Sequence, residues 1–282
     1  MSRQRLLDAT LNAEMIVRNE NLSLPIDVLA LASSRGILVE AKPSAGKGVS
    51  GMLLRVGDDF AIGYATHIKS IGFQRFSIAH ELGHYFLGHA DEIFGGGSSV
   101  HESQAGFGSH EQIELEADHF AAGLLMPSEL FKREAGRHSD GLAAIENVAA
   151  RCQTSITSSA IRYAELTDAA VAIIVSTGSS IDYCFVSRSL RGIKGYRHPV
   201  KGSILPRDSL TRGFNQTASN IADAKRSDDD TDLIEWFHAD EEVEAMEEVI
   251  GLGEYGKTLT IITADLPDDG DDESTFVEPR FR

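Results

Sequence analysis

The stretch RFSIAHELGHYFLGH, residues 75–89, sets three histidines and one glutamate into a pattern that otherwise belongs to a buried helix. Apolar and small residues recur at helical spacing and share one broad side of a helix from about residue 74 to residue 89: Phe76, Ala79, Gly83, Phe86 and Leu87. Ionisable groups are buried only when they are paired or bind a metal. The chain therefore has to fold so that His80, Glu81 and His84 receive such a partner.

His80 and His84 are four residues apart, so on a helix their side chains lie about 40° apart, one turn above the other. Two imidazoles in this arrangement can bind one ion. Glu81 lies beside them, where its carboxylate can reach a water at the metal without being a ligand, as in the HExxH motif of zinc peptidases. Chance produces HExxH in roughly three of a hundred chains of this length, so the motif needs the helical context that this sequence supplies.

A zinc ion that keeps one place open for water needs a third protein ligand. After a loose insert over residues 90–109, a second helix is predicted, with a capping box formed by Ser109 and Gln112 and with Pro127 at its end. Its apolar face comprises Ile113, Ala117, Phe120, Ala121, Leu124 and Leu125. Glu114 is the favoured ligand on this helix. Asp118, four residues later, is then placed to accept a hydrogen bond from a ligand histidine.

Two other carboxylates compete for the place of the third ligand. Glu111 lies one helical turn before Glu114 and on a similar side of the helix. Glu116 lies about 200° away and is expected to be solvated. Glu114 is therefore preferred, with Glu111 as the alternative.

The remaining histidines are expected to be surface or structural residues rather than ligands. His89 falls one residue past the favourable spacing from His84, while His101 and His110 belong to the insert or to a helix start. His119 lies about 140° around the second helix from Glu114 and faces away. A peptidase also needs a donor to the oxyanion, but spacing does not choose among the tyrosines Tyr64 and Tyr85 and these histidines.

The net charge of −17 is concentrated in one part of the sequence, since residues 221–282 contain 20 acidic and 5 basic residues. The runs RSDDDTD and DLPDDGDDE within it are interpreted as solvated loops. Nucleic-acid binding depends on cationic contacts to phosphate. Direct binding to nucleic acid is therefore not expected.

The sequence favours a cytoplasmic protein without a membrane partner. No stretch reaches the roughly eighteen apolar residues of a membrane span, and residues 1–25 lack the pattern of a signal peptide. Two cysteines, Cys152 and Cys184, are too few for a disulfide framework and are interpreted as reduced core thiols.

The element pattern predicts an α+β protein. Residues 1–130 are expected to form the metal-binding domain, in which helices over 4–19 and 25–35 precede three short strands over 36–65 and the two ligand-bearing helices. Residues 131–167 suggest short helices with a tight turn at QTSIT, similar to a helix-turn-helix. Only two basic residues fall within 141–165, so packing or partner contact is favoured over DNA reading.

Residues 168–282 are expected to form an acidic α+β domain of their own. AAVAIIVSTGSSIDYCFVS and KTLTIITAD have the composition of strands, and EEVEAMEEVIGL between them is interpreted as a helix or an irregular amphipathic segment. We interpret this domain as one that regulates the site or recognises its substrate.

RFSIAHELGHYFLGH followed by ELEADHFAAGLLMP resembles the ImmA/IrrE family of zinc metallopeptidases, with a likeness across residues 25–130. The resemblance implies a zincin-like fold and one Zn2+ per chain. It also implies His80, His84 and Glu114 as ligands, Glu81 as general base and Asp118 as the carboxylate that orients a ligand.

The resemblance further implies a cytoplasmic zinc endopeptidase that cleaves a helix-turn-helix transcriptional repressor and so relieves repression in a stress-response or mobile-element system. Two alternatives remain at this point. One is a zinc-bound regulatory protein that binds its partner without turnover, and the other is a general intracellular peptidase.

Overall fold

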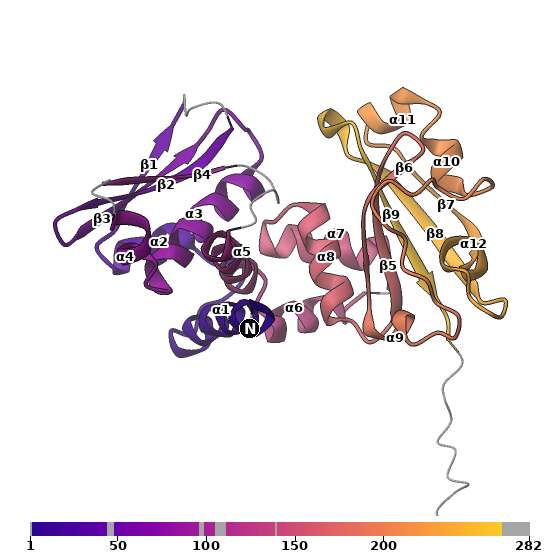
Figure 1. Ribbon diagram of the computed structural model, residues 1–282, viewed down its shortest axis with the longest axis horizontal. Helices are drawn as coiled ribbons and strands as arrows, with labels where there is room; N and C mark the ends of the chain where they lie inside the picture. The colour runs from indigo at the N-terminus through magenta and orange to yellow at the C-terminus, as the bar shows by residue number, and fades with distance from the viewer. Residues whose placement is uncertain (1, 44–47, 96–98, 105–110, 139, 267–282) are drawn as a thin grey trace, which may run out of the picture. The chain divides into compact units, whose positions relative to one another are not determined.

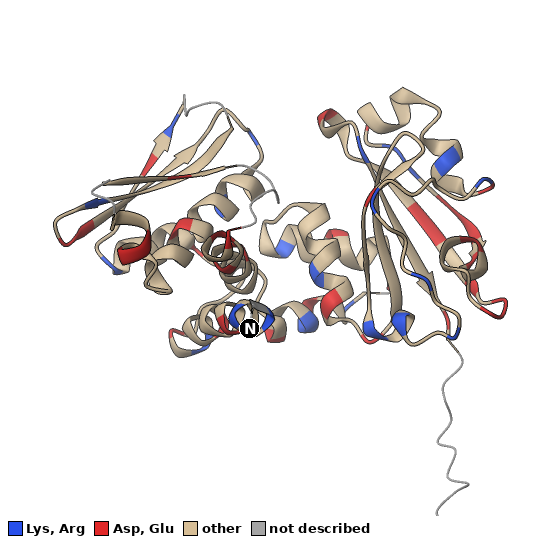
Figure 2. Ribbon diagram, in the orientation of Figure 1, with Lys and Arg blue, Asp and Glu red and all other residues tan. Residues whose placement is uncertain are grey.

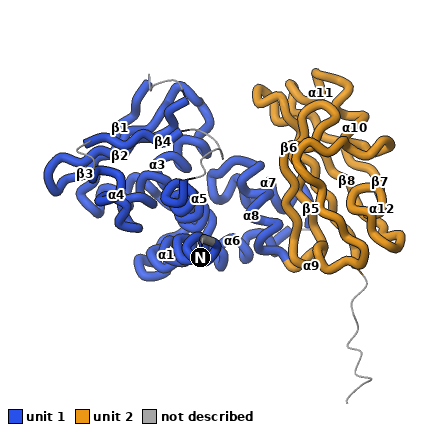
Figure 3. The backbone as a smooth tube through the Cα atoms, viewed as in Figure 1, with its two compact units in different colours: residues 1–167 blue, residues 168–282 orange. Residues whose placement is uncertain are grey.

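The computed structural model describes residues 2–43, 48–95, 99–104, 111–138 and 140–266 (Figure 1). The chain divides into two compact units, residues 1–167 and residues 168–282 (Figure 3). Each unit combines helices with a sheet, so the predicted α+β class is confirmed.

The first unit contains a four-stranded sheet with the strand order β1-β3-β2-β4. Its strands are β1 (Leu38–Lys42), β2 (Val49–Val56), β3 (Asp59–Ala65) and β4 (Val100–Gln104). β1 is parallel to β3, whereas β2 is antiparallel to both of its neighbours. The β2–β3 hairpin turns at Gly57, whose φ of +63° favours glycine. The three strands expected over residues 36–65 are therefore confirmed.

The expectation of a loose insert over residues 90–109 is wrong for the described part of that segment. There, α4 (Ala90–Phe94) precedes β4, and β4 pairs with β2 so that His101 lies opposite Leu53. The buried hydroxyl of Ser50 donates to the backbone oxygen of Ser103 at 3.1 Å. The polar sequence VHESQ does not predict a strand, because β4 is stabilised by its pairing with β2 rather than by local preference.

Four further helices precede or carry the candidate residues: α1 (Ser2–Asn19), α2 (Val28–Ser34), α3 (Ile71–Phe86) and α5 (Gln112–Leu125). Ser70 caps α3 by accepting a hydrogen bond from the backbone N–H of Phe73 at 3.3 Å. The N-cap of α5 is Glu111, without a side-chain cap bond, and Ser109 of the predicted capping box lies outside the described residues. Pro127 follows the end of α5, as expected.

α3 and α5 pack with their backbones close together. A Cβ atom on Gly83 would lie 3.1 Å from the Cα atom and the carbonyl oxygen of Ala117. Elsewhere on α5, a Cβ atom on Gly123 would lie 2.8 Å from the carbonyl oxygen of Thr10 in α1. The predicted apolar face of α5 is buried in this packing: Ile113, Ala117, Phe120, Ala121, Leu124 and Leu125. Side chains of α3 and α5 are thereby brought within reach of one another.

Three helices complete the first unit: α6 (Ser128–Ala135), α7 (Leu142–Cys152) and α8 (Ile156–Leu166). The expected turn at QTSIT is present, with Gln153 in the left-handed region and Ser155 as the N-cap of α8. Arg162 of α8 donates hydrogen bonds to the backbone oxygen of Met126 and to Glu14 of α1. These bonds connect α8 to the remainder of the first unit. The functional boundaries at residues 130 and 167 stay a prediction.

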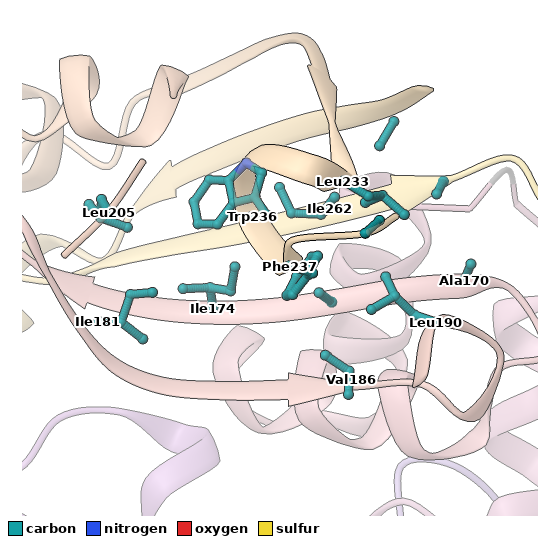
Figure 4. Packing of buried hydrophobic residues seen from close by; sticks show 14 residues of the cluster. Ala170, Ile174, Ile181, Val186, Leu190, Leu205, Leu233, Trp236, Phe237 and Ile262 are labelled. Atoms are coloured by element: carbon teal, nitrogen blue, oxygen red, sulfur yellow. The ribbon is translucent and has the colours of Figure 1, made fainter. Parts of the chain in front are cut away.

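The second unit is built on a five-stranded antiparallel sheet with the order β6-β5-β9-β8-β7. Its strands are β5 (Ala170–Thr177), β6 (Ser180–Val186), β7 (Arg226–Asp232), β8 (Glu244–Gly251) and β9 (Thr258–Ala264). The connections carry α9 (Arg188–Arg191), α10 (Leu210–Phe214), α11 (Ala218–Ala222), α12 (Leu233–Phe237) and a 3-10 turn (Gly253–Tyr255). In the core, Trp236 and Phe237 of α12 belong to one buried cluster with Ile174 and Ile262 of the sheet (Figure 4).

Two segments of the second unit differ from the sequence-based expectation. EEVEAMEEVIGL contributes β8, in which buried residues alternate with more exposed ones from Glu244 to Val249. One of the buried residues is Glu247, whose carboxylate accepts hydrogen bonds from the backbone N–H and the hydroxyl of Thr211 at 2.7 and 2.6 Å. RSDDDTD forms the edge strand β7 rather than a loop, and acidic residues colour part of this strand red (Figure 2). Asp228, Asp229 and Asp230 of β7 are exposed. Charge on an edge strand discourages pairing with other chains. DLPDDGDDE lies mostly outside the described residues.

Both cysteines, Cys152 and Cys184, are free, as expected. Burial raises the pKa of each thiol to about 12, which makes both unreactive. Across the described residues, no helix has the length and apolar character needed to cross a membrane.

The substitution Gly83→Ala tests the packing of α3 against α5. The added methyl group gains about 1 kcal/mol of helix propensity, but it overpacks the backbone of Ala117, which costs about 1–3 kcal/mol. We expect the free energy of unfolding to fall by up to about 2 kcal/mol, measured by denaturant unfolding followed by circular dichroism. Gly213→Ala on α10 is the control, because an added Cβ there meets no described atom within 4 Å. Equal stability of the two variants would contradict the packing argument.

Candidate metal centre

Three donor groups from α3 and α5 converge in the first unit. Nε2 of His80 lies 3.1 Å from Nε2 of His84, and the carboxylate oxygens of Glu114 lie 3.3 and 3.2 Å from these two nitrogens. His80 and His84 are buried, and Glu114 is 8% exposed. The structure thus brings together the three residues singled out in the sequence, in a group able to hold a metal ion.

This donor set fits a zinc ion. Ligand atoms at about 2.0–2.1 Å from a tetrahedral zinc lie about 3.3 Å from one another. The two Nε2 atoms are 3.1 Å apart, and each lies at a similar separation from one oxygen of Glu114: His84 lies 3.2 Å from Oε1 and His80 lies 3.3 Å from Oε2, so the three residues can contribute donors to one ion. Two imidazoles and one carboxylate also leave one of four positions free for water, which is the pattern of a catalytic rather than a structural zinc site.

The carboxylate of Glu81 provides a second indication that this site binds a metal ion or a water molecule. Its side chain is fully buried, yet neither carboxylate oxygen has a hydrogen-bond partner among the described residues. Gly51 of β2 leaves the space for this carboxylate, because a Cβ atom there would lie 2.5 Å from Oε1 of Glu81. Burial raises the pKa of Glu81 to about 7. A carboxylate with a pKa near neutrality suits the transfer of protons in both directions.

At neutral pH two of the three donors, His84 and Glu114, are in the protonation state that binds a metal, whereas His80 carries an additional proton. Burial lowers the pKa of His84 to about 4, so this ring is neutral at pH 7. Burial opposes ionisation of Glu114, but hydrogen bonds from the surrounding imidazoles outweigh it and hold the pKa of Glu114 well below its usual range. Burial also opposes the charged form of His80, but hydrogen bonds to Asp118 and Glu114 outweigh it and raise the pKa of His80 to about 10. A metal ion therefore has to displace one proton, from His80.

Asp118 lies where the sequence places it. Its Oδ1 atom is 2.9 Å from Nδ1 of His80, so it can accept the proton of that ring and orient Nε2 toward the other donors. Glu114 and Asp118 of α5 therefore serve the same centre, Glu114 directly and Asp118 through His80.

His101 was expected to be a surface or structural residue, but it lies at the centre. Its Nε2 is 3.0 Å from Oε1 of Glu114, and its ring centroid is 4.8 Å from that of His84. The error follows from the missed strand, since His101 and the buried Ser103 alternate on β4 with exposed neighbours. That alternation is one of burial in the structure, and the polar residues VHESQ give no sign of it in the sequence.

The other candidates for a role at the site lie outside the donor group, are not described, or are more buried than expected. Glu111 is exposed at the start of α5, outside the donor group, and His110 lies outside the described residues. Tyr85 packs its ring on Phe60, with centroids 5.2 Å apart. Glu116, which was expected to be solvated, is only 5% exposed. That prediction is wrong because α5 is buried on more than one side.

The fold and the donor set define a peptidase-type domain. Residues 32–163 match the family model described as the IrrE N-terminal-like domain, Peptidase_M78, so this part of the first unit is similar to that domain and the resemblance seen in the sequence is confirmed. This match supports a peptidase-type hydrolase.

One solved structure with the same fold is a Mycobacterium tuberculosis transcriptional regulator. It is 14% identical to this chain, with a TM-score of 0.57 over 92% of this chain and 88% of that chain. At this identity the likeness concerns the fold alone. No curated protein matches the sequence.

Zinc binding tests the third ligand. We expect one zinc ion per chain, and we expect Glu114→Ala to raise the Kd for zinc by well over about 100-fold, because loss of even a partner behind a ligand costs about 10–100-fold. Competition with a chromophoric chelator measures the Kd. Glu111→Ala, at the start of the same helix, is the matched control and should bind zinc like the wild type. The reverse ranking of the two variants would make Glu111 the ligand.

Proposed function

We propose that the first unit is a zinc-dependent endopeptidase, with a helix-turn-helix repressor as its protein substrate. Cleavage would relieve repression in a stress-response or mobile-element system. The observation that carries the proposal is the convergence of His80, His84 and Glu114 beside the buried, unpartnered carboxylate of Glu81. The family match supports a peptidase, and the similarity to the structure of a transcriptional regulator supports a regulatory setting. The cytoplasmic location stays a prediction.

The chain's own residues account for the proton transfers of peptide hydrolysis. Zinc, when bound, would polarise the scissile carbonyl and make the attacking water more acidic. Glu81 accepts the proton of that water and then gives it to the leaving amine, a role for which its pKa of about 7 is suited. Asp118 keeps the proton of His80 on Nδ1, so that Nε2 remains available as a donor to the metal. Glu114 supplies the one negative charge of the donor set.

The substitution Glu81→Gln separates turnover from binding. The amide is close in size to the carboxylate but cannot accept the water's proton, so we expect the variant to keep its zinc and to lose cleavage of the repressor by about a hundredfold or more. Zinc content and cleavage of a repressor encoded near this gene are the two measurements. Glu102→Gln, exposed on β4, is the control.

Three outcomes of that experiment separate the candidate functions. Full cleavage by the Glu81→Gln variant would show that Glu81 is not the general base. A wild-type protein that binds zinc and the repressor but cleaves neither it nor any peptide would be a regulatory binding protein. Equal cleavage of the repressor, an unrelated protein and short peptides would indicate a general peptidase.

We further propose that the acidic second unit selects or regulates the substrate. Asp228, Asp229 and Asp230 are exposed along the edge strand β7. A DNA-binding repressor carries a basic face, and opposite charge accelerates the encounter of two proteins.

Replacing these three aspartates by asparagine should slow repressor cleavage several-fold at low ionic strength. The difference should shrink with added salt, because the screening length falls from about 10 Å at 0.1 M to about 3 Å at 1 M. Cleavage of a short uncharged peptide is the internal control and should not change. Identical rates for the variant and the wild type on the repressor at every salt concentration would exclude this role for β7.

A further inference from the structure

A chain of buried polar side chains leads from His84 away from the metal centre. Nδ1 of His84 lies 3.0 Å from Nδ1 of His89, and Nε2 of His89 lies 3.2 Å from Oε2 of Glu116. His89 and Glu116 are each 5% exposed. Beyond them, Arg5 of α1 forms an ion pair with Glu116, with Nε 2.7 Å from Oε1, and its Nη2 donates to Oε2 at 3.1 Å, while Gln112 donates to Oε1 at 2.8 Å.

We propose that His89 and Glu116 form a positioning pair that fixes the tautomer and the orientation of His84 as a metal ligand. The inference rests on the proposed metal site, but it is independent of the substrate. Neither residue reaches the other two donors of the site, so neither is proposed as a ligand or as a catalytic residue.

The protons along this chain can be assigned in one way if His84 binds the metal through Nε2. That nitrogen then carries no proton, so the ring proton lies on Nδ1 and is donated to Nδ1 of His89. His89 in turn carries its proton on Nε2 and donates it to the carboxylate of Glu116. Both rings are neutral, and each contact has one donor and one acceptor. The other tautomer of His89 would place two N–H groups against each other at 3.0 Å.

The end of α3 explains how His89 comes to face His84. In a continuing helix, a residue five positions later would lie about 140° around the axis. Gly88 instead takes φ +74°, its N–H donates to the carbonyl of Tyr85, and the N–H of His89 donates to the carbonyl of His84 at 3.0 Å. This is the paired hydrogen bonding of a glycine-ended helix. The turn carries the His89 ring back to the buried side of His84.

The two histidine ligands are supported in different ways by the same helix. His80 donates directly to Asp118 of α5, whose side chain is 22% exposed. The side chain of His84 is fully buried, and it reaches its carboxylate, Glu116 of α5, through a second imidazole. Partners of this kind raise the basicity of a ligand histidine, and their loss commonly costs about 10–100-fold in metal affinity.

Two substitutions of His89 distinguish positioning from packing. His89→Leu removes both hydrogen bonds but fills the position with an apolar side chain of similar size. His89→Gln keeps an acceptor for His84 and a donor for Glu116. We expect His89→Leu to raise the Kd for zinc about 10–100-fold and His89→Gln to raise it distinctly less, as measured by chelator competition. If His89 only fills space, the order is reversed, because the buried position then prefers leucine.

A matched pair of glutamates tests the far end of the chain. Glu116→Gln should raise the Kd for zinc about tenfold, the lower end of the usual range for such partners. Glu134→Gln is the control, since Glu134 is also buried and also pairs with arginines, Arg137 and Arg151, but lies on α6. The double variant His89→Leu/Glu116→Gln should bind zinc no worse than His89→Leu, because both residues act through one contact to His84.

Thermal unfolding of the metal-free proteins shows whether a variant has lost its fold. If His89→Leu is unfolded, the comparison of Glu116→Gln with Glu134→Gln tests the positioning role instead. Wild-type zinc affinity in both His89→Leu and Glu116→Gln would overturn the positioning role and leave the metal site standing. A wild-type chain that binds no zinc would overturn the site and the inference together. Zinc binding that responds as expected, in a protein that cleaves no repressor, would support this inference and count against the proposed function alone.

Discussion

The close approach of α3 and α5 is the contact on which the candidate site depends. His80, His84 and Glu81 come from one helix and Glu114 and Asp118 from the other, so the donor atoms meet only at one separation of the two helix axes. Gly83 and Ala117 allow that separation, and a longer side chain at either position would move the donors apart. Metal ligands tolerate errors of only about 0.2 Å in distance. The packing of two small residues is therefore as necessary to the site as the ligands themselves.

Much of the candidate site is predictable from sequence because its parts are local. The spacing of His80 and His84, and that of Glu114 and Asp118, fixes neighbouring positions on a helix face whatever the rest of the fold does. The apolar pattern of α5 indicates which of its faces is inward, and the structure agrees. In α3 the pattern is less informative, because residues 77–84 are buried all around the helix, while Phe76, Phe86 and Leu87 of the predicted face are only half-buried. The three strands over residues 36–65 are predictable for a similar reason, since their own residues favour strands.

The errors fall where a residue's environment is set by distant parts of the chain. Glu116 was assigned to solvent on the assumption that α5 buries one face, but α5 packs on α3 near Ala117 and on α1 near Gly123. His101 was missed because β4 exists only through its pairing with β2. In the second unit, the acidic composition of EEVEAMEEVIGL concealed a strand whose buried Glu247 is satisfied by Thr211, a residue 36 positions earlier. Local pattern carries no information on such contacts.

The contact between Arg5 and Glu116 spans 111 positions of the sequence and has a consequence for how metal supply affects the protein. Long loops close slowly and at an entropic cost, so the donor set and its supports are assembled only when α1, α3 and α5 have met. A metal ion that binds this assembled state and not the unfolded chain stabilises it by mass action, by about 2.7 kcal/mol when the free ion exceeds its Kd a hundredfold. This stabilisation by the metal ion applies to all three helices and not only to a short loop. The stability of the first unit against unfolding then depends on the free concentration of the ion.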